Sequence, residues 1–313
     1  MISHTSEAAL RLRLLDSGAA MLWAVEDVPC EGGEPLVAGW FAVPHSEDAD
    51  RLILDRRPQN HGERRLAWLR LPLGCMFGRI ILGPSKSIRG SGYDLSTYFS
   101  QLREHPSGLD RQCVGREFDG AVFVAYGGVA GRKYVLAMTC LGMGDFNSTD
   151  IAQETHLSIL ARGDALAPGA LMEWGSPIST GDILQGVYID DGIVVAIVDR
   201  DAAHLPGEDN VIIDKSLSAL TSAGLDVAVK KGFGAAASGD KASSSSAARP
   251  PVGDSTFTAW GTQVCNDTGL VGTAPDKRLG ISALLWKIVS KRRAERQIVE
   301  RALSLLPHPV SHR

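Results

Sequence analysis

The stretch LQGVYIDDGIVVAIV, from Leu184 to Val198, constrains the fold more than any other part of the chain. Two adjacent carboxylates, Asp190 and Asp191, lie between two apolar runs rich in β-branched residues. Such runs favour strands, and an Asp-Asp-Gly tip supplies residues that tolerate the positive φ angles of a tight turn. We therefore predict a strand, a turn and a strand. Buried charge is costly unless it is paired or bound to a metal, so the two acids require an explanation.

Two explanations fit the acid pair itself. One is a solvated hairpin tip, which needs no further function. The other is a magnesium site, because Mg²⁺ takes one or two carboxylates and completes its shell with phosphates and water. Neighbouring strand residues point to opposite faces, so one Asp would enter the site and the other would assist from its edge. Asp94 follows a predicted strand and could supply a further acid, as two-metal phosphoryl transfer requires.

The composition limits the compartments in which the protein is expected and the partners that it can bind. With a net charge of −4 over 313 residues, the chain is not a generic nucleic-acid binder, and phosphate contacts must come from local basic clusters. The five cysteines are scattered and form no Cys-x-x-Cys, which argues against a disulfide framework or a zinc site. The apolar runs are too short for a membrane span, and the N-terminus lacks a signal-peptide core. We expect an intracellular protein, cytoplasmic or nuclear, with no membrane partner.

Apolar periodicity gives a coarse map of the elements. Strands are expected at 51–55 and 87–94, a helix from 95 to about 105, a hairpin around a glycine-rich turn over 120–141, a helix near 148–162, and a helix within 208–225 that Gly224 ends. The run 76–82 fits a strand or a helix. A second hairpin is expected over 256–273, and an amphipathic helix or helix pair over 280–305. The Ser/Ala/Pro-rich segment 235–254 is typical of a flexible linker.

Six motifs carry a family resemblance. In chain order they are RLILDRRPQN, DLSTYF, LGMGDFNSTDIAQ, YIDD, GLDVAVKKGF and TAWGT. Together they resemble the fingers and palm of a reverse transcriptase, an RNA-directed DNA polymerase, of the retrotransposon type. The resemblance implies that Asp94, Asp190 and Asp191 are catalytic and bind two Mg²⁺ ions, with Mn²⁺ as a possible substitute.

The same resemblance assigns roles around the incoming nucleotide. Arg51 would contact the triphosphate, and Arg57 belongs to an Asp-x-Arg-x-x-Asn signature. Phe99 would exclude the 2′-hydroxyl of ribonucleotides. Gly144 and Gln153 would line the nucleotide and template site.

Three further assignments concern the primer, and one concerns the leaving group. Lys231 would protonate the departing pyrophosphate. Tyr188 would pack beside the primer end, although an ordinary strand aromatic fits it equally well. Trp260 and Gly261 would grip the primer.

The implied fold is α+β, a right-hand polymerase fingers and palm, with an antiparallel palm sheet backed by helices and a truncated thumb. The implied regions are listed next. They are an N-terminal segment (1–48), fingers with the first palm strand and helix (49–140, the strand and helix at 91–104), palm (141–234), linker (235–254), primer-grip-like hairpin (255–276) and the basic helical start of a thumb (277–313).

The leading function is therefore template-directed DNA synthesis, with an RNA or DNA template, a DNA primer and dNTPs as partners, and with other retroelement chains as further candidates. The alternative is a catalytically inactive retroelement remnant that at most binds nucleic acid. Acids at Asp145 and Asp150 in the third motif, the inserted linker and the short thumb favour this alternative. A different two-metal nuclease or cyclase would share the acids, but it would not need Phe99, Gln153 and Lys231 in register.

Overall fold

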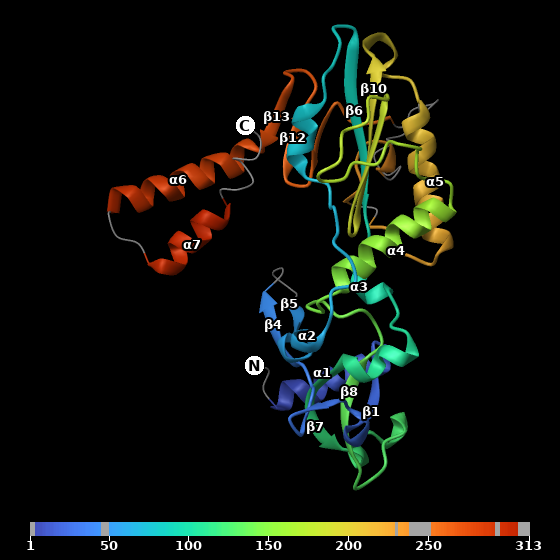
Figure 1. The fold of residues 1–313 in the computed structure, drawn as a ribbon, viewed down its shortest axis with the longest axis vertical. Coiled ribbons are helices and arrows are strands. Elements are labelled where there is room, and N and C mark those ends of the chain that lie inside the picture. The colour runs from blue at the N-terminus through green and yellow to red at the C-terminus, as the bar shows by residue number, and fades with distance from the viewer. Residues whose placement is uncertain (1–3, 45–49, 229–230, 238–251, 292–294, 306–313) are drawn as a thin grey trace, which may run out of the picture. The chain divides into compact units, whose positions relative to one another are not determined.

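A computed structural model describes residues 4–44, 50–228, 231–237, 252–291 and 295–305 (Figure 1). It divides into two compact units: unit 1 is Met1–Leu69 with Thr97–Glu154, and unit 2 is Arg70–Ser96 with Thr155–Arg313. Most of the linker predicted at 235–254 lies outside the described residues. Among the residues that are described, no helix is long and apolar enough to cross a membrane.

The central sheet of unit 2 contains three antiparallel strands in the order β6–β10–β9. Their bounds are Lys86–Asp94 for β6, Ile183–Tyr188 for β9 and Asp191–Asp199 for β10. The strand ending at Asp94 and the strand–turn–strand of the acid pair are thus confirmed. Near-continuous burial along β10 explains its β-branched run, because both faces of this strand are covered.

A second sheet of unit 2 is an antiparallel meander of β11 (Thr256–Ala259), β12 (Thr262–Cys265) and β13 (Leu270–Thr273). The predicted bend at residues 266–269 joins β12 to β13. A second tight bend joins β11 to β12 at Trp260 and Gly261, whose φ angles are +48° and +75°. The segment is therefore three strands rather than one hairpin.

Aromatic rings from the second sheet and from residue 233 cover glycines of the first sheet. A Cβ atom added at Gly186 would lie 2.1 Å from the Trp260 ring, and one at Gly92 would lie 2.3 Å from Phe233. Trp260 also stacks on Phe77, with ring centroids 5.3 Å apart and planes 8° apart. Glycine at these positions lets the two layers approach closely.

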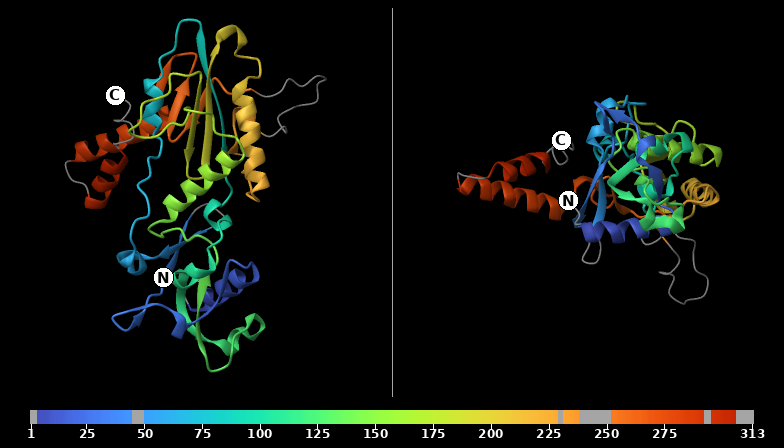
Figure 2. Two further views of the ribbon diagram at one scale, coloured as in Figure 1. Left: turned by 45° about the vertical axis from the view of Figure 1, so that its right-hand side comes forward. Right: turned by 90° about the horizontal axis from the view of Figure 1, so that it is seen from below.

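The two long helices predicted after residue 148 and before Gly224 are both present. The helix α4 spans Ser148–Arg162, and α5 spans Glu208–Ser222 with Gly224 at φ +78° beyond its end. Figure 2 shows α5 alongside the central sheet, where Asp209 bonds to Arg89 of β6. The C-terminal segment is a helix pair, α6 (Pro275–Lys291) and α7 (Arg296–Leu305), which is one of the two forms expected.

Unit 1 is organised around a sheet of order β1–β8–β7. These strands are Ala20–Ala24, Lys133–Met138 and Cys113–Asp119, and α1 (His4–Asp16) packs its leucines against the same core. A hairpin of β4 (Gly39–Pro44) and β5 (Asp50–Asp55) confirms the strand predicted at 51–55. The remaining short elements of both units are α2 (Arg57–Gly62), β2 (Cys30–Glu31), β3 (Glu34–Pro35), η1 (Val25–Asp27), η2 (Gly74–Arg79), η3 (Pro106–Gln112), η5 (Arg200–Ala202) and η7 (Gly234–Ala236).

Three local predictions are corrected. The helix expected from 95 to about 105 is only α3, Tyr98–Gln101, because Thr97 takes a left-handed φ of +43° and Leu102 is already extended. The hairpin expected over 120–141 is wrong in its first half, since η4 (Gly120–Tyr126) is a 3₁₀ segment and β8 pairs instead with β7. The ambiguous run 76–82 begins in the 3₁₀ helix η2 and contains no strand.

Candidate active site

The turn between β9 and β10 consists of Ile189 and Asp190, because Tyr188 pairs directly with Asp191. Ile189 has a φ of +58°. A left-handed conformation costs a β-branched residue about 1–2 kcal/mol, so the surrounding structure must hold this turn. The prediction placed the turn correctly but gave the positive φ to Asp-Gly. Gly192 lies instead within β10, where a Cβ atom would come 2.2 Å from the Tyr93 ring.

The three predicted acids meet at one end of the central sheet. Asp94, the last residue of β6, lies opposite Asp191 in the antiparallel register. Directly opposite Cα atoms in such a ladder are roughly 4.5–5.5 Å apart. The backbone N–H of Leu95 donates to the carbonyl oxygen of Asp190 over 3.0 Å, which ties the end of β6 to the turn.

Lys231 completes this cluster. Its Nζ lies 2.6 Å from Oδ2 of Asp94, whose side chain is 16% exposed, against 65% for the lysine. The hydrogen bond to Asp94, followed by the charges of Asp94, Asp190 and Asp191, raises the pKa of Lys231. The sequence predicted Lys231 for this site, and the structure places its ammonium on a carboxylate.

Asp191 is the acid whose ionisation is most disfavoured. Burial, then the charges of Asp190 and Asp94, raise its pKa from 3.8 to about 6, and Lys231 opposes the shift. The cluster therefore contains more negative charge than Lys231 neutralises. An added cation would relieve this repulsion.

We expect Asp191→Asn to unfold at a higher urea concentration than the wild type at pH 8 in EDTA. A carboxyl with a raised pKa binds more protons in the folded state, so stability is lost as pH rises from 3.8 to about 6. Asparagine does not titrate, so the variant does not lose this stability. The difference between the urea midpoints of the variant and the wild type should become smaller towards pH 4. Urea midpoints between pH 4 and pH 8 measure it, and a variant no more stable at pH 8 contradicts the prediction.

The carboxylates of this cluster could hold a divalent cation only together with oxygens from a substrate. Among the described residues, no three His, Cys, Asp or Glu side chains are placed to hold an ion by themselves. Asp94 nevertheless has a buried Oδ1 that lacks a hydrogen-bond partner, and carboxylate oxygens are the hard ligands that Mg²⁺ prefers. One or two carboxylates suffice where a substrate's phosphates supply the other oxygens. The residues present fit that shared kind of site.

A cavity of about 250 Å³ opens beside the acids. Its lining includes Asp94, Asp191, Lys231, Phe233 and Trp260. Tyr188 is half-buried at the end of β9. Trp260, Lys231, Asp94 and Asp191 thus share one cavity, as their assignments to one reaction centre would require.

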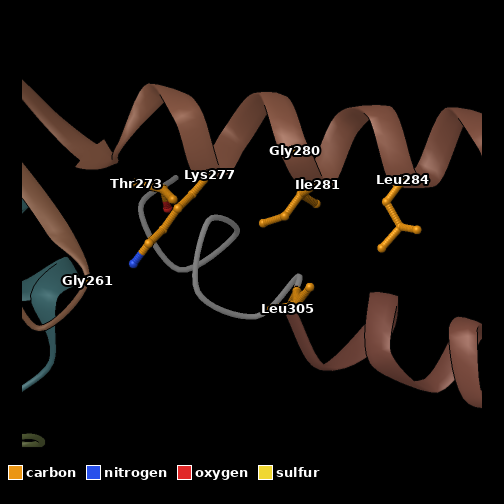
Figure 3. A pocket seen from close by; sticks show the side chains of 7 residues that line it. All are labelled: Gly261, Thr273, Lys277, Gly280, Ile281, Leu284 and Leu305. Atoms are coloured by element: carbon orange, nitrogen blue, oxygen red, sulfur yellow. The ribbon is translucent and has the colours of Figure 1, made fainter. Parts of the chain in front are cut away.

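A larger, apolar cavity of about 400 Å³ lies at the C-terminal helix pair (Figure 3). Ile281 and Leu284 project from α6 towards Leu305 at the end of α7, and Gly261 lines another side. Among the described residues, Lys277 is its one titratable lining residue, and no carboxylate of that part of the chain lines it.

The other predicted site residues, apart from Tyr188, Trp260 and Gly261, belong to unit 1. Asp55 accepts two hydrogen bonds from the Arg57 side chain, at 2.7 and 2.6 Å, and this pairing lowers the pKa of Asp55. Arg51 is exposed on β5, Phe99 is half-buried on α3, and Gln153 is buried on α4. Gly144 has a φ of +106° and sits against Leu54, whose carbonyl oxygen would be 2.6 Å from an added Cβ.

Two asparagines fasten the loop around Gly144 to the segment after β5. Asn60 donates to the carbonyl oxygen of Gly144 over 2.8 Å and accepts from the N–H of Phe146 over 3.1 Å. Asn147 accepts from the N–H of Leu66 and donates to the carbonyl oxygen of Arg64. The Asn of the first motif thus has a structural task, which is to hold the third motif.

The two unexpected acids of that loop are paired. Asp145 forms an ion pair with buried Arg56 at 3.0 Å, and Asp150, 2% exposed, forms one with Arg65 at 3.1 Å. Each acid is therefore matched by an arginine within the same unit. The negative charge that favoured an inactive remnant is therefore offset locally.

Sequence reasoning missed His156, which supports the turn of the acids. Its side chain is fully buried on α4, and burial lowers its pKa to about 4, so the ring is neutral. Nδ1 lies 2.8 Å from the carbonyl oxygen of Ile189, and Nε2 lies 3.1 Å from the Tyr93 hydroxyl. The spacing of Ala152, His156 and Leu160 on one helix face was the available signal.

Comparisons with known proteins support the fold. No family model and no curated protein matches the sequence. Solved structures do match: a foamy viral protease-reverse transcriptase with an RNA/DNA hybrid (TM-score 0.58, 15% identity) and two with double-stranded DNA (0.55 and 0.53, both 16%). They cover 97%, 98% and 93% of this chain, which spans only 31%, 48% and 38% of theirs. The chain has a reverse-transcriptase-like, α+β polymerase fold.

Proposed function

We propose that this chain catalyses template-directed DNA synthesis by nucleotidyl transfer, as the polymerase domain of a retroelement. The observation that carries the proposal is that Asp94 lies next to Asp190 and Asp191 at the turn, and that Lys231 forms an ion pair with Asp94. Asp94 and the Asp190–Asp191 pair are far apart in the sequence, yet they meet at one end of the central sheet. In the reaction, the primer 3′-hydroxyl attacks the α-phosphate of a dNTP and pyrophosphate leaves.

Asp94 and Asp190 would hold Mg²⁺, or Mn²⁺, with Asp191 assisting. When bound, the ions would lower the pKa of the attacking hydroxyl and neutralise charge on the phosphates. The chain's own groups supply the rest. Lys231 is protonated at neutral pH, since its pKa is raised by Asp94, and it would be the group that protonates the leaving pyrophosphate.

The unit 1 residues would bind the nucleotide and template. Arg51 and Arg57 would contact the triphosphate, Phe99 would exclude the 2′-hydroxyl, and Gly144 with Gln153 would line the base pair. Fastening of the Gly144 loop by Asn60 supports this, since a nucleotide site needs a fixed loop. Tyr188, Trp260 and Gly261 would contact the primer.

The partners proposed are an RNA or DNA template, a DNA primer and dNTPs. The solved structures of similar fold are complexes with double-stranded DNA or an RNA/DNA hybrid, which favours such partners. Those proteins are foamy viral, whereas the motifs of this chain suggested a retrotransposon, and that origin remains a prediction. So does the reading of 277–313 as the start of a thumb.

The alternative is an inactive remnant that only binds nucleic acid. Its strongest sequence argument was the acidic loop, and the ion pairs of Asp145 and Asp150 weaken it.

Primer extension separates the two functions. The full chain is incubated with a DNA primer on an RNA template, dNTPs and Mg²⁺, and binding of the same duplex is followed by fluorescence anisotropy. We expect extension by single nucleotides that EDTA stops. Binding without any incorporation, with Mg²⁺ or Mn²⁺ and on RNA or DNA templates, would establish the remnant instead.

A further inference from the structure

A buried chain of hydrogen bonds, here called the relay, runs from Tyr93 through His156 to Ile189 in the turn that carries the acids. A carbonyl oxygen can only accept, so the contact with Ile189 requires a proton on Nδ1 of His156. Nε2 is then unprotonated and accepts from the Tyr93 hydroxyl. The relay runs from β6 through α4 to the turn, and Tyr93 and His156 are each at most 4% exposed.

Both ends of the relay adjoin the acids. Tyr93 directly precedes Asp94, and its ring occupies the space in which Gly192 has no side chain. Ile189 directly precedes Asp190 and holds a left-handed φ of +58°. A residue in this region of φ/ψ persists only where its surroundings over-determine it, and the His156 hydrogen bond is such a determinant.

We infer that His156 is a positioning residue, oriented by Tyr93, that fixes the Ile189 turn and thereby the carboxylates of Asp190 and Asp191. The inference rests on the proposed function for its effect on rate, but its effect on the turn does not depend on that function. The competing explanation is a core histidine that contributes only to overall stability.

Three variants separate these explanations. His156→Leu removes the donor and keeps an apolar side chain. His156→Asn retains an N–H group at about the position of Nδ1, and Tyr93→Phe removes only the hydroxyl. Leu160→Ala is the control: it leaves a cavity on the same buried face of α4, one turn further on, without touching the relay.

The first measurement is hydrogen exchange of peptides covering 183–192 in the full chain, without metal or substrate. We expect His156→Leu to speed exchange at the turn about tenfold relative to the remainder of β9 and β10, as loss of one net hydrogen bond implies. His156→Asn should stay within about threefold of the wild type, and Leu160→Ala should show no excess at the turn.

The second measurement is steady-state primer extension. For His156→Leu we expect kcat to fall about 10- to 100-fold while the KM for dNTP stays within about threefold, because misplaced carboxylates act on the chemical step. If His156→Leu fails to fold, His156→Asn and Tyr93→Phe give the answer. The inference is overturned if every variant at His156 and Tyr93 resembles Leu160→Ala in both its exchange rate at the turn and its kcat. A wild type that extends no primer refutes the proposed function, and the exchange data still decide the relay.

Discussion

Asp94→Asn is expected to lower the rate of primer extension by about a hundredfold to a thousandfold, the loss typical when a charge-stabilising group is removed from a reaction centre. The amide keeps the size of the side chain but removes the negative charge that would attract Mg²⁺. The buried Oδ1 of Asp94 is then no longer a carboxylate ligand. Lys231 loses its partner, yet it is 65% exposed, so folding should survive. Asp190→Ala should have a comparable effect.

Asp201→Asn is the matched control, since Asp201 is exposed on η5 of the same unit. Single-turnover extension with saturating dNTP and Mg²⁺ gives the rates, and circular dichroism verifies folding. Duplex affinity should change little in Asp94→Asn, because phosphate contacts by basic groups dominate binding. Activity within tenfold of the wild type in either acid variant would remove the metal assignment.

Arg89→Met should destabilise the chain by about 3–5 kcal/mol, the cost of leaving one partner of a buried ion pair unpaired. Arg89 of β6 and Asp209 of α5 are 3% and 1% exposed as residues and form two hydrogen bonds, of 2.8 and 2.6 Å. Arg89 also donates to the carbonyl oxygens of Ala203 and Leu205. The pair therefore joins the helix and its preceding loop to the sheet.

The double variant Arg89→Met/Asp209→Leu should lose less stability than the sum of the single variants, because two apolar side chains leave no buried charge. Lys86→Met is the control. Lys86 of β6 pairs with Asp199 of β10 at 3.1 Å, but the side chains are 32% and 65% exposed, so we expect a loss below about 1 kcal/mol. Urea unfolding monitored by tryptophan fluorescence measures all four chains.

Local sequence patterns predicted the elements that carry the acids, and failed where distant residues decide the backbone. The β-branched run after Asp191 and the apolar periodicity of α4 are sufficient signals, and both elements were predicted. The helix expected after Asp94 has the right spacing, yet Thr97 adopts a left-handed φ of +43° that no periodicity reveals. Motif order suggested that the three acids would meet, whereas their pairing register came from the structure alone.

The same limit applied to the surroundings of the site. Asp145 looked unfavourable because its partner, Arg56, is far away in the sequence and its pairing depends on the fold. His156 looked unremarkable because the contact that gives it a task is to a backbone carbonyl, which any residue provides. Charges and side-chain roles of this kind are readable only after the chain has been folded.

The glycines beneath aromatic rings have an evolutionary consequence. At Gly186 and Gly92, the rings of Trp260 and Phe233 fill the volume that a side chain would occupy. Neither member of such a pair can drift independently: a methyl group gained on the strand has to coincide with a smaller ring on the opposing layer. In a lineage of such chains, these positions should therefore covary, with glycine paired to bulky aromatics and alanine to slimmer side chains.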